Sequence, residues 1–253
     1  MSLSEHELGR YRRQLILDGW GPGTQEKLRN SKVFVAGAGG LGCAAALNLT
    51  LAGVGHIRIC DSDTVELTNL NRQFLHPEQN IGREKTLSAT ETLRGLNSAI
   101  AIEPVTREIN EESVAELVGD ADLILDCLDN FPGRYTLSKH AAENSIPLVF
   151  AAIWGMEGRL TFLHPPATPC LSCLFPRAPE RHEIPVLGGV ACTSGSLQAL
   201  EAINYLSSSR PTLAGRMLIM DYQTMRFQEL EIARNPDCPV CGSRGQEGGQ
   251  TGA

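Results

Sequence analysis

The segment from Val33 to Gly42 constrains the fold most, because a short apolar run passes into a glycine-rich turn and then into an alanine- and leucine-rich stretch. This order is typical of a strand, a phosphate-binding loop and a helix. Gly37 allows the tight turn, Gly39 lets the backbone approach a phosphate, and Gly42 lets the helix pack closely on the strand. The helix would then present free N–H groups and a positive dipole end to the phosphates.

A second predicted strand, His56–Cys60, is followed directly by Asp61. Asp61 lies near the position where such a unit places a ribose-binding carboxylate, roughly 20 residues after the glycines. A nucleotide that contains a ribose is therefore the first hypothesis for the ligand. The glycine loop and Asp61 alone would also permit an NAD-dependent oxidoreductase.

Strand and helix patterns continue to alternate through the first part of the chain. Apolar runs predict strands at 100–105, 122–127 and 148–152, and helical periodicity predicts helices at 84–96 and 111–118. The polar stretch between the second strand and the 84–96 helix is expected to be a long loop at the carboxyl ends of the strands. Open α/β sheets bind their ligands at this edge.

The pattern changes after residue 152, because the expected strands at 158–163 and 217–231 are not each followed by a helix. Such strands fit antiparallel additions to a parallel sheet. A helix with a broad apolar face is predicted at 194–207, after a loop at 177–189 that is rich in Pro, Gly and charge. We therefore predict an α/β fold with a Rossmann-like, mostly parallel sheet and antiparallel C-terminal strands.

Composition limits the class of protein. A chain of 253 residues with 42% hydrophobic content can bury a large core. Its formal net charge of −7 argues against a nucleic-acid partner, because phosphate contacts need clustered Lys and Arg. The sequence has neither a signal-peptide pattern nor an apolar run of roughly 20 residues, so we expect a soluble cytoplasmic protein that does not contact a membrane. Its eight cysteines are then expected to be reduced, some buried and some bound to metal.

Four of the cysteines form two C-x-x-C pairs, Cys170 with Cys173 and Cys238 with Cys241. Each pair can place two thiolates on one cation, and four sulfurs complete a closed tetrahedral zinc site. The alternative is a redox-active C-x-x-C, but a redox pair needs no second copy, and turn residues flank both pairs here. We therefore predict a structural Zn²⁺ knuckle that ties the C-terminal part to the middle of the chain.

Arg72, Lys85 and Asp129 follow strand ends or begin helices on the side of the sheet where the glycine loop is expected. Each of them alone is more often a member of a surface ion pair. Together they suit triphosphate chemistry, because two cations can neutralise the β- and γ-phosphates while a carboxylate holds Mg²⁺. ATP with Mg²⁺ is therefore favoured over a nicotinamide nucleotide.

Several motifs together resemble the ThiF/MoeB/HesA family, whose members are bacterial relatives of ubiquitin-activating enzymes. The resemblance extends from about residue 8 to residue 242, with the motifs in order and at family-like spacing. They are Arg10-Tyr11-x-Arg13-Gln14, Gly37-Ala-Gly39-Gly40-Leu-Gly42, Asp61-x-Asp63, Asn69-Leu-Asn-Arg72-Gln73, Asp126-Cys-Leu-Asp129-Asn130 and both C-x-x-C pairs.

The resemblance implies that the chain uses ATP and Mg²⁺ to adenylate the C-terminal glycine of a small ubiquitin-fold sulfur-carrier protein of the MoaD/ThiS type. Pyrophosphate would be released, and the adenylate would serve molybdopterin, thiamine or related sulfur transfer. By position, the implied nucleotide-binding residues are Gly37, Gly39, Gly40, Gly42, Asp61 at the ribose, Asn69, Arg72 and Lys85 at the phosphates, Asp129 at the Mg²⁺, and Asn130.

The family also suggests how the chain is organised. The arginine that matches Arg13 enters the ATP site of the other subunit of a homodimer, so the resemblance implies that Arg13 is catalytic in a neighbouring chain. Taken alone, its segment would be interpreted as a solvated basic face. We expect one adenylation domain at 1–242 and a disordered Gly- and Gln-rich tail at 243–253. Within the domain we expect a helical arm at 4–29, a nucleotide-binding core at 30–165, and a zinc- and carrier-binding part at 166–242.

One departure from the family lies in the loop before the 194–207 helix, where many relatives carry a cysteine that can link covalently to the carrier. The matching segment here, 179–183, contains no cysteine. Cys192 follows some ten residues later, where a helix dipole could favour its thiolate, but a packed thiol is the simpler interpretation. We expect the enzyme to stop at the acyl-adenylate. A separate cysteine desulfurase or sulfurtransferase would supply the sulfur, since no sulfurtransferase domain follows Cys241.

Two alternatives to adenylation stay open: an NAD-dependent oxidoreductase of the Rossmann type and a non-catalytic scaffold that binds a carrier protein. The zinc pairs and Arg72 argue against the first. The second is disfavoured because a scaffold would not need to keep both the cationic side chains that bind phosphates and the carboxylate that holds Mg²⁺. Carrier-dependent exchange of labelled pyrophosphate into ATP, without a requirement for NAD, distinguishes all three.

Overall fold

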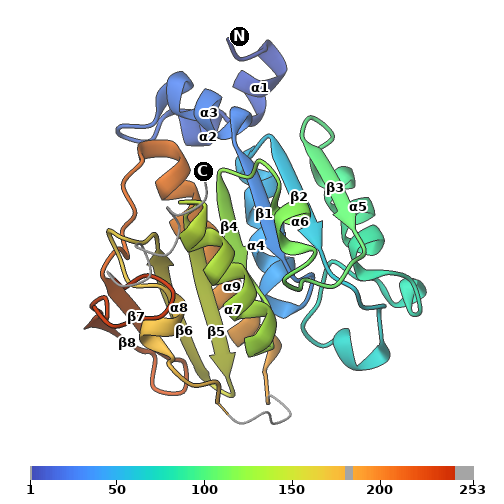
Figure 1. Cartoon of the computed structure of the whole chain (residues 1–253). Coiled ribbons are helices and arrows are strands. Elements are labelled where there is room, and N and C mark those ends of the chain that lie inside the picture. The colour runs from blue at the N-terminus through green and yellow to red at the C-terminus, as the bar shows by residue number, and fades with distance from the viewer. Residues whose placement is uncertain (1, 180–184, 243–253) are drawn as a thin grey trace, which may run out of the picture.

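The computed structural model describes residues 2–179 and 185–242, whose strands form one eight-stranded sheet in the order β3-β2-β1-β4-β5-β6-β7-β8 (Figure 1). The strands are β1 (Lys32–Ala36), β2 (His56–Cys60), β3 (Ala101–Val105), β4 (Leu123–Asp126), β5 (Leu148–Trp154), β6 (Glu157–Leu163), β7 (Arg216–Asp221) and β8 (Arg226–Glu231). Strands β1 to β5 pair in parallel, and β6 to β8 add in antiparallel orientation. The predicted α/β fold class is confirmed.

Helices cover both faces of this sheet. Helices α4, α5 and α9 pack on one face, and α6, α7 and α8 pack on the other (Figure 1). The helical elements are α1 (Glu5–Arg10), α2 (Arg12–Leu15), α3 (Gly21–Asn30), α4 (Gly40–Ala52), η1 (Leu67–Asn69), η2 (Glu78–Asn80), α5 (Lys85–Leu96), α6 (Val114–Val118), α7 (Phe131–Glu143), α8 (Leu171–Leu174) and α9 (Gly188–Ser208). No helix in the described ranges is both long and apolar enough to cross a membrane.

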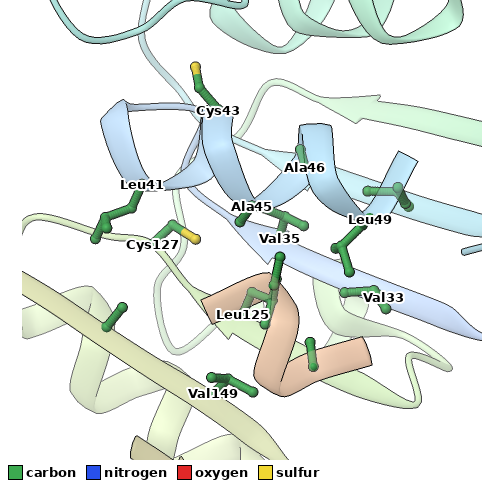
Figure 2. Close-up of a cluster of buried hydrophobic side chains, with 14 of the residues drawn as sticks. Val33, Val35, Leu41, Cys43, Ala45, Ala46, Leu49, Leu125, Cys127 and Val149 are labelled. Carbon is green, nitrogen blue, oxygen red and sulfur yellow. The ribbon is translucent and has the colours of Figure 1, made fainter. Parts of the chain in front are cut away.

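Strand β1 shows why the sheet needs cover on both sides. Val33 and Val35 belong to the apolar cluster under α4 and α9, whereas Phe34 and Ala36 belong to the cluster under α6 and α7. Alternate side chains of a strand point to opposite faces, so a run of four apolar residues is buried only when helices lie on both faces. Figure 2 shows the first cluster, in which the small side chains of α4 let that helix lie close to β1.

Helix α9 begins at Gly188, earlier than the predicted start at residue 194. Two glycines at the start of the segment, with Thr193 and a β-branched Val190 soon after them, carry little helical signal. A Cβ at Gly188 would lie 2.4 Å from the carbonyl oxygen of Asn71, so the close packing of the helix start on that loop requires glycine. The predicted loop at 177–189 is therefore shorter than expected, and its residues 180–184 lie outside the described residues.

The predicted strand at 217–231 is a hairpin of β7 and β8. The carboxylate of Asp221 accepts hydrogen bonds from the backbone N–H groups of Gln223 and Thr224, at 2.9 and 3.1 Å, and so forms the turn between them. The N-terminal arm, expected at 4–29, consists of α1, α2 and α3, and Tyr11 separates α1 from α2. The predicted tail at 243–253 lies outside the described residues.

Candidate active site

The glycine loop joins β1 to α4 with a backbone that only glycine fits. Gly37 has φ of +101°, and a Cβ there would lie 2.9 Å from the carbonyl oxygen of Cys127. A Cβ at Gly42 would lie 1.9 Å from the carbonyl oxygen of Gly37. The helix can therefore start directly against the loop, with half-exposed Gly39 as its N-cap. No side chain caps this end, so N–H groups of the first turn are available to an anion.

A cavity of about 410 Å³ lies beside the glycine loop at the carboxyl edge of the parallel strands. The residues around it are Ser62, Asp63, Thr64, Glu66, Asn69, Arg72, Gln73, Lys85 and Asp129. The side chain of Arg72 lies 3.6 Å from where a Cβ of Gly40 would be, which connects the cavity to the first turn of α4. The structure thus brings four predicted site residues to one place: Asn69, Arg72, Lys85 and Asp129.

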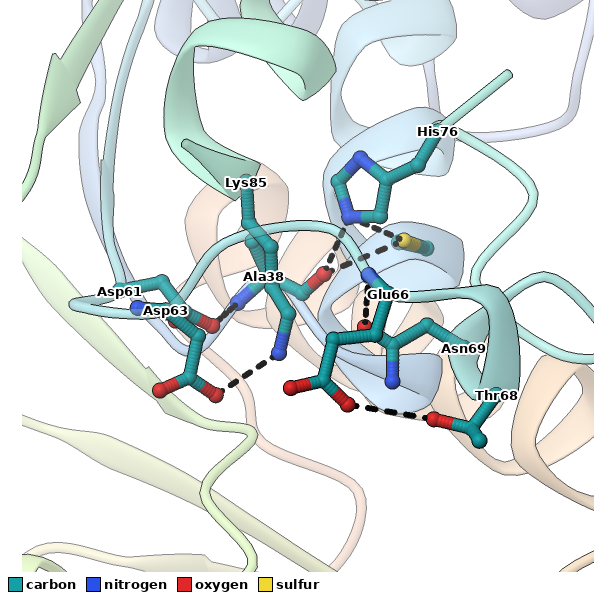
Figure 3. Close-up of polar contacts among 9 residues, drawn as sticks. Ala38, Asp61, Asp63, Glu66, Thr68, Asn69, His76 and Lys85 are labelled. Carbon is teal, nitrogen blue, oxygen red and sulfur yellow. Dashed lines mark hydrogen bonds and ion pairs between the residues drawn. The ribbon is translucent and has the colours of Figure 1, made fainter. Parts of the chain in front are cut away.

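Lys85 begins α5 and is almost buried, with 8% of its side chain exposed. Its ammonium group pairs with the carboxylate of Asp63 at 2.8 Å, and its backbone N–H donates to the carbonyl oxygen of Asp63 at 3.0 Å (Figure 3). Asp63 itself is 67% exposed at the rim of the cavity. A buried lysine with one exposed partner can exchange that partner for a phosphate oxygen without leaving its position.

Arg72 and Asn69 are both held by the loop that carries them. The Arg72 guanidinium donates to the carbonyl oxygen of Thr68 at 2.9 Å and to the side-chain oxygen of Asn71 at 3.0 Å. Asn69 is buried, and its side-chain oxygen accepts the backbone N–H of Glu66 at 3.0 Å (Figure 3). Both residues line the cavity, so the amide nitrogen of Asn69 and the remaining N–H groups of Arg72 could donate to a ligand there.

Asp61 fixes the glycine loop from the side of β2. One carboxylate oxygen accepts the backbone N–H of Ala38 at 2.7 Å, and the other accepts the backbone N–H of Asp63 at 2.8 Å. Burial raises the pKa of Asp61, and the nearby charge of Lys85 opposes that shift. Each carboxylate oxygen keeps a further lone pair, so both could also accept hydroxyl groups of a ribose.

The loop that carries Asp129 is held by a buried ion pair. The guanidinium of Arg134 lies 3.9 Å from the carboxylate of Asp126, and it also donates to the carbonyl oxygens of Leu128 and Ala151. Burial raises the pKa of Asp126, and the charge of Arg134 opposes the shift. Asp129, which immediately follows Leu128, is exposed at the cavity.

Three predicted side chains do not line the cavity: Asp61, which holds the glycine loop, Asn130 and Arg13. The side-chain oxygen of Asn130 accepts the backbone N–H of Gly133 at 2.9 Å and caps α7, and Asn130 does not line the cavity. Arg13 is exposed on α2. That helix lies near the C-terminal end of α4, where Tyr11 meets Gly53, while the cavity lies at its other end. A helix of 13 residues is about 20 Å long, so Arg13 does not reach this cavity within one chain.

The two C-x-x-C pairs meet, as the sequence predicted. Their four sulfurs all lie within 4.8 Å of one another. Three of the separations are 3.9 Å for Cys170 and Cys173, 3.5 Å for Cys170 and Cys238, and 3.4 Å for Cys173 and Cys241. A zinc ion with Zn–S bonds of about 2.3 Å would place tetrahedral sulfurs about 3.8 Å apart, so the donor set fits Zn²⁺.

Of the four cysteines outside this cluster, three are buried and one is partly buried. Cys43, Cys60 and Cys127 are buried, and burial raises the pKa of Cys43 and of Cys60 to about 12. Cys192 is partly buried in the first part of α9, inside the helix and not before it. A thiol with a raised pKa is a poor nucleophile at neutral pH, so the three buried cysteines are unsuited to catalysis.

Sequence reasoning missed five residues that line the cavity: Ser62, Asp63, Thr64, Glu66 and Gln73. Gln73 is buried, and its side-chain oxygen has no hydrogen-bond partner in the structure. Asp63 and Gln73 lie inside the motifs that resemble the family, and this position could have identified them as site residues. Glu66 lies outside those motifs, so the sequence offered no comparable indication for it.

The fold and the site define a Rossmann-like protein with a phosphate-binding loop and a four-cysteine cluster. The sequence model of the ThiF family matches residues 11–240, and the chain belongs to that family. It is 42% identical over 251 residues to the SAMP-activating enzyme E1 of Haloferax volcanii, covering 97% of this chain and 93% of that protein. It is 40% identical over 245 residues to the molybdopterin-synthase adenylyltransferase of Escherichia coli K12, and the match covers 95% of this chain and 98% of that protein.

A solved structure agrees with this assignment. The crystal structure of E. coli MccB with ATP has a TM-score of 0.83 to this chain at 25% identity, and the match covers 92% of this chain and 75% of that one. The family predicted from the motifs is therefore confirmed by sequence and by fold.

Proposed function

We propose that this protein is an adenylyltransferase that uses ATP to activate the C-terminal glycine of a ubiquitin-fold sulfur-carrier protein. The observation that carries the proposal is the convergence of Arg72, Lys85 and Asp129 on one cavity beside the glycine loop. These residues come from three separate segments of the chain. The names of the SAMP-activating and molybdopterin-synthase relatives support a protein carrier as the substrate.

In the proposed reaction the carrier carboxylate attacks the α-phosphorus of ATP, and the bond from that phosphorus to the bridging oxygen of pyrophosphate breaks. The carboxylate is already ionised, so no base has to remove a proton. Arg72 and Lys85 would bind the β- and γ-phosphates and stabilise the charge that grows on the leaving group. Asp129 would hold a Mg²⁺ ion, which supplies further charge neutralisation for pyrophosphate. Asp61 would accept the ribose hydroxyls.

The cavity favours ATP over NAD as the nucleotide. A dinucleotide fold of the oxidoreductase type needs the glycine loop and a ribose carboxylate, but it does not need two cations and an exposed carboxylate at the same edge. The same three charged residues argue against a scaffold that only binds a carrier, since binding alone does not require them.

The homodimer is part of the same proposal. Arg13 is exposed and lies at the end of α4 opposite the cavity of its own chain. We propose that it completes the site of a second copy. The four-cysteine cluster would hold Zn²⁺ as a structural ion, because four sulfurs leave no coordination position for a substrate. The separate sulfur donor stays a prediction.

The decisive experiment measures exchange of labelled pyrophosphate into ATP, with and without a carrier protein of the MoaD/ThiS type. We expect exchange that requires Mg²⁺ and the carrier and is unaffected by NAD. A carrier that has lost its C-terminal glycine is the matched control, and it should support none. Binding of the intact carrier without any exchange would instead support the scaffold.

A further inference from the structure

The backbone of Ala38, between two glycines of the phosphate loop, is held from both sides. Its N–H donates to Asp61, and its carbonyl oxygen accepts a hydrogen bond from Nε2 of His76 at 2.9 Å (Figure 3). The thiol of Cys43 also reaches this oxygen, at 3.4 Å. Ala38 is 2% exposed and His76 is 3% exposed, so both bonds lie in the interior.

A chain of hydrogen bonds fixes which nitrogen of His76 carries the proton. The side-chain NH₂ of Asn80 donates to the Ser88 hydroxyl oxygen at 3.0 Å, and the Ser88 hydroxyl lies 3.1 Å from Nδ1 of His76. The carbonyl oxygen of Ala38 can only accept, so Nε2 carries the hydrogen, and Nδ1 of the neutral ring accepts from the Ser88 hydroxyl. Burial lowers the pKa of His76, which keeps the ring in this neutral form.

The orientation of one peptide group follows from that bond. In a planar trans peptide the C=O and the N–H point in opposite directions. The Ala38 carbonyl points inward to His76, so the N–H of Gly39 points outward. Gly39 is partly exposed, and the nearest atom to a Cβ built there is the side-chain nitrogen of Gln73, at 3.8 Å. Gln73 lines the cavity, so Gly39 lies next to the place where phosphates are expected.

We propose that His76 is a positioning residue: it locks the Ala38–Gly39 peptide so that the Gly39 N–H is presented to a phosphate of the nucleotide. This inference rests on the proposed function, because it needs a nucleotide in the cavity. His76 touches no substrate itself. Without His76 the Ala38 carbonyl keeps only the weak thiol donor of Cys43, at 3.4 Å, so the peptide can rotate more easily towards water.

The test compares ATP binding by the wild type, His76→Phe and His76→Gln, measured by isothermal titration calorimetry with Mg²⁺ present. Phe fills the space without a donor, whereas the Gln amide places an N–H near the position of Nε2. One lost hydrogen bond to phosphate should raise the dissociation constant of ATP about 5- to 10-fold in His76→Phe. His76→Gln should stay close to the wild type. Adenosine lacks phosphates, so its dissociation constant should be unchanged in all three.

Asn97→Leu is the matched control. Asn97 is also buried and donates to the carbonyl oxygen of Thr50 at 2.9 Å, near the other end of α4. The variant should lower the melting temperature and leave ATP binding unchanged. Equal ATP affinity in wild type and folded His76→Phe would overturn the inference, and so would an equal loss in Asn97→Leu. If His76→Phe does not fold, failure of His76→Gln to bind ATP like the wild type overturns it. A wild type that binds no ATP would refute the proposed function instead.

Discussion

The glycine loop and the four-cysteine cluster both join distant segments of the chain, but they do so by different means. At the glycine loop, the partly buried Asp61 and the buried His76 hold the backbone, and charged side chains remain at the cavity for a ligand. In the cysteine cluster the sulfurs lie close to one another, and among the described residues Val240 is the one non-cysteine hydrophobic residue of the cluster. Changes at the loop edge should therefore alter chemistry and binding, whereas changes in the cluster should alter stability.

The largest expected effect tests the first half of this comparison. Asp129→Ala should reduce pyrophosphate exchange by about 10³-fold, because the residue is expected to hold Mg²⁺ on charge that grows in the transition state. Asp129 is exposed, so the melting temperature should stay near that of the wild type. Glu143→Ala, at an exposed acid near the end of α7, is the control and should keep full activity. Near-normal exchange in Asp129→Ala would remove the magnesium role.

The second prediction tests the cluster. Cys173→Ser should lower the free energy of unfolding by about 3 kcal/mol, because it removes one of four ligands that tie the C-terminal part to α8. The affinity for ATP should change much less. Urea denaturation, ATP titration and metal analysis of the same preparations measure this. Well under one zinc per chain in fresh wild-type protein would contradict the prediction.

The third prediction concerns a part of the site that one chain does not contain. Arg13→Ala should lower exchange by roughly 10²-fold, as expected when one charge-stabilising donor is lost. Mixing it with Asp129→Ala should restore part of the activity, because half of the sites in a mixed dimer would be intact. If no mixture of the two recovers activity, the site is complete within one chain.

The smallest effect is expected at Cys192. Cys192→Ser should change pyrophosphate exchange by less than about 2-fold, because adenylation needs no thiol. Mass spectrometry of a reaction quenched without reductant should show no adduct between enzyme and carrier. A thiol-labile adduct that is present in the wild type and absent from Cys192→Ser would make Cys192 a catalytic nucleophile.

The difference between contacts set by nearby residues and contacts set by distant ones explains how much of the fold and the site could be predicted from the sequence. The sheet, the four-cysteine cluster and three charged residues of the cavity, Arg72, Lys85 and Asp129, followed from short patterns whose spacing is fixed by local geometry. The start of α9 did not, because Gly188 is chosen by its contact with the backbone of Asn71, a residue far away in the chain. His76 was missed for a similar reason: it lies in a loop without periodicity, and only the fold places it against Ala38.

Arg134 illustrates a further limit. Nothing in its local sequence distinguishes it from other arginines of a helix, yet it is buried and holds the loop that carries Asp129. Its partner Asp126 lies at the end of β4, so the pair forms only when the loop folds back on the strand. In the sequence motif Asp126 and Asp129 look equivalent. In the structure Asp126 is buried and pairs with Arg134, whereas Asp129 is exposed at the cavity.

The ion pair between Lys85 and Asp63 has a consequence for turnover. In the proposed reaction, the nearly buried ammonium group has a negative partner at every stage: the carboxylate before ATP enters, phosphate oxygens while it is bound, and the carboxylate again as pyrophosphate departs. In that reaction Asp63 would compete with pyrophosphate for Lys85. The ion pair that re-forms would offset part of the affinity of Lys85 for phosphate and would so favour the release of pyrophosphate.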